Sequence, residues 1–154
     1  MKDTTLCYVE NDGKYLMLHR IKKENDMNKD KWIGIGGKVE PFETAFECIK
    51  REAFEETGLT LENPQLRGIV YFHSTIWSSE RMFLYTCDKF SGHIKECDEG
   101  VLEWIEKDKI TSLPLWEGDK IFFDLLNEGE SGFELTLNYN KDTLVSHKIK
   151  KQAF

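Results

Sequence analysis

Three glutamates, Glu52, Glu55 and Glu56, follow one another at the spacing i, i+3, i+4. At about 100° per residue, their carboxylates fall within about 100° of arc on one side of a helix. The same turn angle puts Ala45 and Ile49 on that side, so the acids extend the face expected to pack. Like charges at these spacings repel, and desolvating them is costly without a cation. A hard divalent metal ion, which prefers oxygen ligands, would resolve the conflict.

The alternative is a solvated polar face, the usual role of acidic residues on a helix. Arg51 can pair with Glu55 or Glu47 four residues away, which neutralises one acid and leaves an excess of negative charge. The position of the acids around the helix therefore favours a metal site. We assign Arg51 the role of orienting the carboxylates through ion pairs.

A glycine-rich turn leads into this helix. Gly34, Gly36 and Gly37 leave the backbone free to adopt positive φ and to approach a ligand closely. Exposed amides before a helix N-terminus suit an anion such as phosphate, whereas the alternative is an ordinary tight turn. The segment has neither the Gly-Lys-Ser/Thr of a Walker loop nor the Gly-x-Gly-x-x-Gly of a dinucleotide fold.

Capping residues mark both ends of the helix. Thr44 followed by Glu47 is a capping-box pattern, and Gly58 is the expected C-terminal stop. These signals predict a helix over residues 43–57. Glu43 either supports the turn or is an ordinary acid near the helix N-terminus.

The segment as a whole resembles the Nudix box of the pyrophosphohydrolase superfamily. Gly37 and Glu43 stand at the family's spacing from the run Arg51 to Leu59. Ala53 occupies a packing position where the family prefers a bulkier aliphatic residue. Three other segments are similar to MutT-type 8-oxo-dGTP diphosphatases, and nearest to their bacterial MutX-like branch: Lys31 to Lys38, Asp98 to Trp104, and Trp116 to Asp119.

The resemblance implies an α/β fold, a Nudix-type α/β/α sandwich with a mixed β-sheet. It also implies Mg²⁺-dependent hydrolysis of 8-oxo-dGTP or a related purine nucleotide to the monophosphate and pyrophosphate, with Mn²⁺ able to substitute. The implied metal ligands are the Gly36 carbonyl and the carboxylates of Glu52, Glu55, Glu56 and Glu99. The implied catalytic residues are Arg51, Glu52, Glu55 and Glu56. Glu52 is the preferred general base, although several metal-binding carboxylates leave this choice open.

The implied substrate contacts are Arg20, Gly37, Lys38, Trp116 and Asp119. Trp116 would stack on a purine and Asp119 would bond its edge; the alternatives are a core tryptophan and a helix cap. Ile33 replaces the asparagine that binds purine in the mammalian enzyme. Core packing is the more common role for three further residues that could line the pocket: His73, Trp77 and Met82.

Glu99 and Arg20 lie outside the box. Taken alone, Glu99 belongs to an acidic surface loop, and only the family likeness makes it a metal ligand. Arg20 follows an expected strand end, where the resemblance places a cation that contacts phosphate. Basic residues also crowd the approach to the glycine turn, where they could offset polyphosphate charge or remain solvated: Lys22, Lys23, Lys29, Lys31 and Lys38.

Length and composition indicate a single Nudix domain over residues 1–154, because 18.1 kDa with 40% hydrophobic residues can bury one core. The absence of a signal peptide and of a membrane-length apolar run predicts a cytoplasmic protein. The net charge of −7 argues against duplex nucleic acid as a partner. The spacing of the four cysteines favours reduced structural thiols. The sequence leaves the oligomeric state open.

Apolar periodicity predicts strands at 4–10, 15–20, 32–36, 65–73, 80–88, 101–106, 132–138 and 143–149, with a second helix at 118–128. Residues 22–31 are expected to form a mobile loop. Two other functions remain open. One is a Nudix hydrolase of a nucleotide sugar, a dinucleoside polyphosphate or an RNA 5′ end, the last disfavoured by charge. The other is a non-catalytic nucleotide sensor, which would not need the full set of acids.

Overall fold

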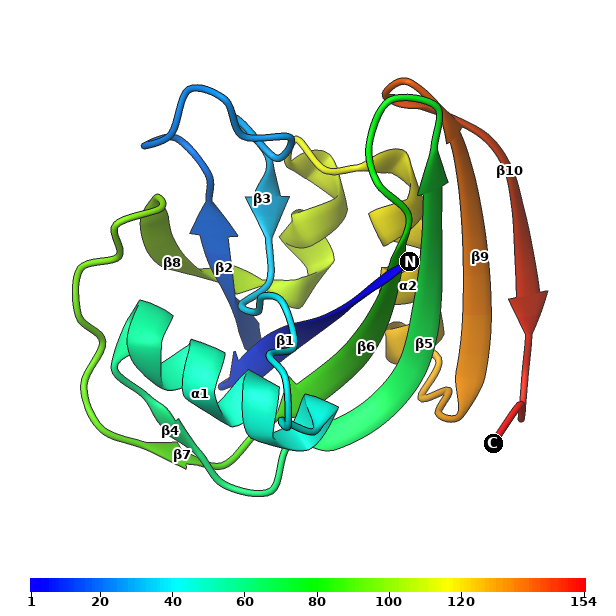
Figure 1. Cartoon of the computed structure of the whole chain (residues 1–154). Helices are drawn as coiled ribbons and strands as arrows, with labels where there is room; N and C mark the ends of the chain where they lie inside the picture. The colour runs from blue at the N-terminus through cyan, green and yellow to red at the C-terminus, as the bar shows by residue number, and fades with distance from the viewer.

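The computed structural model describes residues 1–154 (Figure 1). Its α-helices are α1 (Ala45–Thr57) and α2 (Glu117–Asn127), and a 3₁₀ helix spans Lys107–Ser112. The first five strands are β1 (Lys2–Asn11), β2 (Lys14–His19), β3 (Trp32–Ile33), β4 (Thr60–Leu61) and β5 (Gln65–Ser74). The other five are β6 (Glu80–Cys87), β7 (Phe90–Ser91), β8 (Val101–Glu106), β9 (Phe133–Asn140) and β10 (Thr143–Lys150).

A mixed, eight-stranded sheet organises the molecule. Its order is β10-β9-β5-β6-β1-β2-β3, and β8 also pairs with β2. Strands β1 and β6 run parallel, as do β5 and β9, whereas the other pairs are antiparallel. Strands β4 and β7 form a separate two-stranded sheet.

The two α-helices cover opposite faces of the sheet, as Figure 1 shows. Neighbouring residues of a strand point to opposite faces, and β1 illustrates the division. Leu6 and Tyr8 belong to the core cluster beneath α2, whereas Cys7 and Val9 belong to the cluster beneath α1. The expected α/β/α sandwich with a mixed sheet is therefore confirmed.

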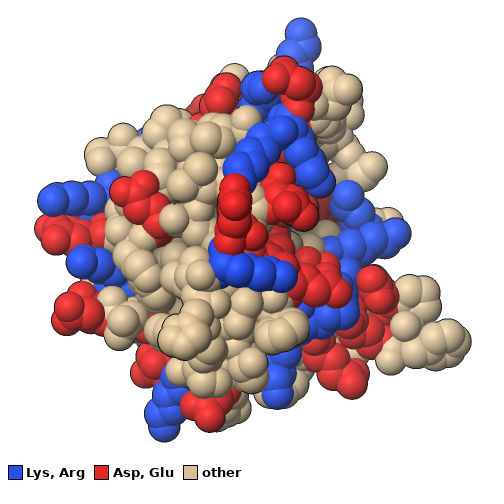
Figure 2. All heavy atoms as spheres, turned by 90° about the vertical axis from the view of Figure 1, so that its left-hand side faces the viewer, with Lys and Arg blue, Asp and Glu red and all other residues tan.

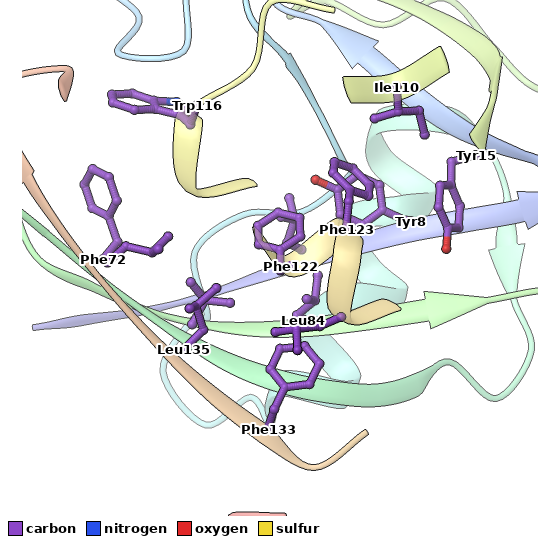
Figure 3. Packing of buried hydrophobic residues seen from close by; sticks show 14 of the residues in the cluster. Tyr8, Tyr15, Phe72, Leu84, Ile110, Trp116, Phe122, Phe123, Phe133 and Leu135 are labelled. Atoms are coloured by element: carbon purple, nitrogen blue, oxygen red, sulfur yellow. The ribbon is translucent and has the colours of Figure 1, made fainter. Parts of the chain in front are cut away.

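The core beneath α2 is strongly aromatic (Figure 3). The ring centroid of Tyr8 lies 5.8 Å from that of Phe122 and 4.7 Å from that of Phe123. Burying each large apolar side chain stabilises the fold by about 1.5–3 kcal/mol. This packing fixes α2 against the sheet and so positions the residues at its N-terminal end.

The caps predicted for α1 are present. The Thr44 hydroxyl accepts a hydrogen bond from the Glu47 amide, and the Glu47 carboxylate accepts one from the Thr44 amide. Gly58 ends the helix with φ of 83°, a left-handed conformation that glycine adopts without steric cost. The helix proper begins at Ala45, two residues after the expected start.

The glycine turn differs from the expectation in its backbone. Gly34, Gly36 and Gly37 are absent from the positive-φ residues, so φ is not what requires glycine there. Close approach is the reason, because a Cβ at Gly36 would lie 1.9 Å from the Thr5 carbonyl oxygen. Strand β3 stops at Ile33, since the chain beyond it contacts β1 only through the isolated bridges Cys7↔Ile35 and Thr4↔Lys38.

The remaining predictions agree closely with the structure. The other predicted strands and the second helix are present with end shifts of at most two residues, and residues 20–31 contain no regular element. The two-residue strands β4 and β7 and the 3₁₀ helix were not predicted, because so few residues carry no periodic signal. All four cysteines are free and buried. Neither α-helix combines the length and apolar character needed to cross a bilayer.

Candidate active site

One cavity of about 430 Å³ gathers most of the predicted site residues. It is lined by the glycine turn, the loop between β2 and β3, strands β1, β5, β6 and β9, and the N-terminal end of α2. The predicted residues that line it are Arg20, Gly36, Gly37, Lys38, Glu52, Glu99, Trp116 and Asp119. Three predicted residues do not line it: Arg51, Glu55 and Glu56.

Glu56 lies beneath the cavity wall, where its side chain is buried. Its carboxylate accepts a hydrogen bond of 3.1 Å from the Gly36 amide. The pKa of Glu56 is raised to about 10, first by burial and then by the nearby carboxylates of Glu99 and Glu52, against a lowering effect of the Gly36 amide. A cluster of like charges therefore exists here, made by two residues of α1 and one from a distant loop.

Glu52 is half-buried and faces the glycine turn. Burial raises its pKa, whereas its hydrogen bond to Arg51 lowers it. A Cβ at Gly37 would lie 2.6 Å from the Glu52 carboxyl carbon. Glycine at position 37 thus leaves the space that this carboxylate occupies.

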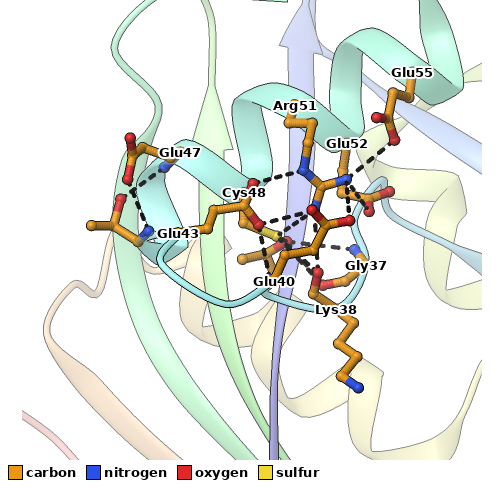
Figure 4. Close-up of polar contacts among 11 residues, drawn as sticks. Gly37, Lys38, Glu40, Glu43, Glu47, Cys48, Arg51, Glu52 and Glu55 are labelled. Atoms are coloured by element: carbon orange, nitrogen blue, oxygen red, sulfur yellow. Dashed lines mark hydrogen bonds and ion pairs between the residues drawn. The ribbon is translucent and has the colours of Figure 1, made fainter.

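Arg51 links the acids around it (Figure 4). Its Nε and Nη2 donate to Glu43 at 2.6 and 3.0 Å, and Nη1 donates to Glu52 at 2.9 Å. Nη1 also donates to Glu55 at 3.2 Å. The guanidinium lowers the pKa of Glu43 to about 2, and the Glu43 carboxylate also accepts from the Glu40 amide. Arg51 therefore holds the turn and the helix together, and Glu43 supports the turn.

Glu55 lies apart from the other two acids of the box. Its side chain is 58% exposed and contacts Arg51. Glu52 and Glu56 differ by about 40° around the helix on the packed side, whereas Glu55 lies about 60° from Glu52 toward solvent. Lys38 is also exposed, and in Figure 4 its side chain points away from the polar network. Glu55 is therefore separate from the other two helix carboxylates, and the third carboxylate of the cluster is that of Glu99.

Arg20 lies between two acids at the cavity. Its Nε donates to Asp26 at 2.6 Å and its Nη1 donates to Glu99 at 2.8 Å. Lys23 also pairs with Glu99, at 3.5 Å. These contacts attach the β2–β3 loop to the Glu99 loop. Asp26 was not singled out from the sequence, because a lone acid in a polar loop carries no distinguishing signal.

Trp116 is both a core residue and part of the cavity wall. Its indole N–H donates to the Asn28 side chain at 2.7 Å. Its ring packs edge-on against Phe72 at 5.6 Å and Tyr139 at 5.2 Å, and Lys31 Nζ lies 4.7 Å from the ring centroid. Trp116 can therefore be a core residue and still contact a ligand in the cavity.

Asp119 is buried beside this tryptophan and lines the cavity. Burial raises its pKa to about 8, against a lowering effect of Lys31. The N-cap residue Trp116 makes no side-chain capping bond, and the Gly118 amide of the first turn donates instead to the Tyr139 hydroxyl at 2.7 Å, so a helix cap does not explain this aspartate.

Several cavity residues were not found from the sequence. Ile33 and Met82 line the cavity, whereas His73 and Trp77 do not. The residues without an earlier assignment include Lys2, Thr4, Asn28, Phe72, Glu80, Leu137 and Tyr139. Strand alternation could have shown that some of them share a face, but not which strands are neighbours.

The acids suit a divalent cation in type and number. Glu52, Glu56 and Glu99 supply carboxylate oxygens, which Mg²⁺ prefers, and the carboxylates of Glu99 and Glu52 add to the burial that raises the pKa of Glu56. No three Asp, Glu, His or Cys side chains form a ready-made cage. The donors fit the metal in chemical type, and binding would require these carboxylates to move closer together.

Comparisons with known proteins agree with this site. A family model described as "NUDIX domain" matches residues 2–126. The chain is 30% identical over 158 residues to the "Uncharacterized Nudix hydrolase YvcI" of Bacillus subtilis (strain 168), covering 99% of this chain and 96% of that protein. It is 30% identical over 147 residues to the "Oxidized purine nucleoside triphosphate hydrolase" of Danio rerio, covering 94% and 92%.

A solved structure supports the same relationship. The crystal structure of a MutT protein from Bacillus halodurans has a TM-score of 0.86 and 31% identity, over 97% of this chain and 98% of that one. The family match and these relatives extend over most of the sequence and include the acidic helix. The chain therefore belongs to the Nudix family and is a hydrolase of phosphoric anhydride bonds.

Proposed function

We propose that this Nudix hydrolase is a Mg²⁺-dependent pyrophosphohydrolase of 8-oxo-dGTP or a related purine nucleoside triphosphate. The observation that carries the proposal is one cavity with a carboxylate cluster near Glu52 and Glu99 and a buried aromatic wall at Trp116. The first suits a metal-bound polyphosphate and the second suits a purine ring. The biological role would be removal of damaged nucleotides from the cytoplasmic pool, which supports DNA repair.

At the polyphosphate end, the proposed metal ligands are the Gly36 carbonyl and four carboxylates, those of Glu52, Glu55, Glu56 and Glu99. Bound Mg²⁺, or Mn²⁺ in its place, would neutralise phosphate oxygens and lower the pKa of a water molecule for attack on the β-phosphorus. For Glu55 this role requires a rotation away from Arg51, its present partner.

Glu52 is the proposed general base, and Arg51 is its positioning residue. The 2.9 Å contact from Arg51 fixes the Glu52 carboxylate at the cavity wall. Arg20, whose guanidinium faces the same cavity, would contact a phosphate oxygen in competition with Glu99 and Asp26. Lys38 would approach the substrate only from the exposed rim.

At the other end, Trp116 would stack on the purine and Asp119 would hydrogen-bond its edge. A pKa of about 8 keeps the Asp119 carboxyl largely protonated at neutral pH, so it can both donate and accept. Ile33 offers no polar group, and discrimination between bases therefore depends on other side chains of the cavity.

The charges around the cavity disfavour RNA as the substrate. Acidic and basic side chains are mixed on the face shown in Figure 2, rather than forming a continuous basic surface. Lys22 pairs with Glu96, Lys23 with Glu99 and Lys29 with Glu24. Because backbone recognition needs free basic groups, a small nucleotide fits this surface better.

A hydrolysis screen that separates the nucleotide products by chromatography and also measures pyrophosphate tests the proposal, because ADP-ribose would be cleaved without release of pyrophosphate. The panel contains 8-oxo-dGTP, dGTP, ATP, ADP-ribose and triphosphorylated or capped RNA, each with Mg²⁺ and with Mn²⁺. We expect the highest kcat/KM for a purine triphosphate, with 8-oxo-dGTP first, and release of pyrophosphate with the monophosphate. A preference for ADP-ribose or for RNA would assign the enzyme to another Nudix substrate class.

A further inference from the structure

A row of side chains crosses the sheet under the aromatic end of the cavity. In the strand register, Lys2 on β1 is opposite Glu80 on β6, Glu80 is opposite Phe72 on β5, and Phe72 is opposite Leu137 on β9. Residues paired in this way point to the same face of a sheet, and all four line the cavity. Because Phe72 packs against Trp116, the row is the floor beneath the proposed purine position.

Glu80 is the acid in this row, between an apolar ring and a lysine. No Lys or Arg nitrogen lies within the 4.0 Å ion-pair distance of its carboxylate. Burial raises the pKa of Glu80, whereas Lys2 and Thr4 lower it without cancelling the effect. The carboxylate therefore lacks the hydrogen bonds that water or a paired cation would provide.

Thr4, whose hydroxyl lies near enough to Glu80 to lower the pKa of that carboxyl, gives a second observation at the same place. It is 7% exposed, and its hydroxyl oxygen is buried without a hydrogen-bond partner. Its register partner on β6 is Met82, which offers no polar group, and both residues line the cavity. An unpaired buried hydroxyl is rare in native proteins and marks a place where a ligand can supply the missing bond.

We propose that Glu80, supported by Thr4, is a specificity-determining residue that accepts a hydrogen bond from the N7–H or the 2-amino group of the bound purine. The proposal rests on the proposed function, since it assumes that a purine occupies this end. A carboxylate on an otherwise apolar floor attracts an N–H donor and repels a ring nitrogen with a lone pair.

This preference distinguishes the oxidised base from the ordinary one. An 8-oxopurine carries a hydrogen on N7, whereas N7 of an ordinary purine is an acceptor. A guanine also carries a 2-amino group that hypoxanthine lacks. Glu80 therefore selects a base that carries an N–H group hypoxanthine lacks, independently of the contact assigned to Asp119.

Binding of nucleoside monophosphates without metal tests the proposal. Isothermal titration calorimetry would compare 8-oxo-dGMP, dGMP and dIMP on wild-type protein, Glu80→Met and Glu80→Gln. We expect Glu80→Met to weaken 8-oxo-dGMP or dGMP at least fivefold more than it weakens dIMP. Glu80→Gln keeps an acceptor oxygen, so it should weaken the binding of 8-oxo-dGMP or dGMP less than Glu80→Met does.

The panel also identifies the N–H group. A selective loss for 8-oxo-dGMP assigns it to N7, and an equal loss for 8-oxo-dGMP and dGMP assigns it to the 2-amino group. Equal effects on all three ligands, or no effect, would overturn the proposal. Glu134→Met is the matched control, because Glu134 belongs to the same sheet but does not line the cavity.

Kinetics keep this inference separate from the proposed function. The same variants are assayed for kcat/KM with 8-oxo-dGTP, dGTP and dITP, and circular dichroism confirms folding. If wild-type enzyme releases no pyrophosphate from any of them, the proposed function fails. If wild-type enzyme is active and Glu80→Met ranks the three substrates as wild type does, only the role of Glu80 fails.

Discussion

The two ends of the cavity are built in different ways. The carboxylate end comes mostly from one short stretch, since Gly36, Glu52 and Glu56 lie within 21 consecutive residues and only Glu99 comes from elsewhere. The aromatic end combines side chains from β1, β5, β6, β9 and α2. The difference shows that the groups proposed for the chemistry are encoded locally, whereas those proposed for selectivity depend on how distant strands are ordered.

Their electrostatics differ as well. At the carboxylate end, Arg51 donates to Glu52 and Arg20 donates to Glu99, whereas Glu56 accepts only from the Gly36 amide. At the aromatic end, Asp119 is buried and Glu80 is half-buried, and neither forms an ion pair. Burial raises the pKa of acids at both ends, but only the carboxylate end gathers several acids close enough to raise one another's pKa, as a cation site requires.

Removing one carboxylate from the first end should have the largest effect. We expect Glu52→Gln or Glu56→Gln to reduce kcat by at least about a hundredfold, because each substitution removes a proposed metal ligand. Glu52→Gln also removes the proposed general base. The measurement is pyrophosphate release with saturating Mg²⁺ and nucleotide.

Folding must be intact in these variants. Glu56→Gln removes a buried acid that repels its neighbours, so thermal unfolding should occur at the wild-type temperature or above it. Unchanged turnover in a folded variant would contradict the metal assignment.

Glu99 joins the cluster from outside the helix, and its removal should be less severe. We expect Glu99→Gln to reduce turnover about tenfold and to raise the Mg²⁺ concentration needed for half-maximal rate. Titration of Mg²⁺ at fixed nucleotide measures both. Wild-type rates at every Mg²⁺ concentration would remove Glu99 from the metal site.

Alanine substitutions at two neighbouring glycines should affect catalysis and stability differently. A Cβ at Gly37 meets the movable end of Glu52, so Gly37→Ala should reduce kcat about tenfold and change stability by less than about 1 kcal/mol. A Cβ at Gly36 meets the Thr5 backbone, so Gly36→Ala should destabilise by about 3 kcal/mol or more. Urea unfolding and steady-state kinetics distinguish the two. Equal losses of kcat and of stability in the two variants would show that the turn acts as one rigid unit.

The same contrast explains what could be predicted from the sequence. Helix caps act over a few residues, so the bounds and both caps of α1 were predicted nearly in full. The exposure of Glu55 was not predicted. The spacing i, i+3, i+4 groups it with Glu52 and Glu56, whereas burial of the side of α1 that carries Ile49 and Ala53 leaves Glu55 toward solvent.

Long-range placement was the harder part. The row from Lys2 to Leu137 depends on β6 lying between β1 and β5, an order that periodicity does not contain. Asp26 and Asn28 became recognisable only through their contacts with Arg20 and Trp116. The exposed or buried pattern of each strand was predictable, whereas its neighbours were not.

The smallest expected effect concerns pH at the aromatic end. The folded state raises the pKa of Asp119 from 3.8 to about 8, so it binds this proton more tightly than the unfolded chain does. Stability from this group is therefore lost as pH rises from about 4 to about 8. Asn cannot titrate, and Asp119→Asn should gain at least about 1 kcal/mol of stability relative to wild type between pH 5 and pH 8. Urea unfolding across this range measures the difference. Parallel curves for the two proteins would mean that Asp119 is not held protonated, and that the two ends of the cavity do not differ in this way.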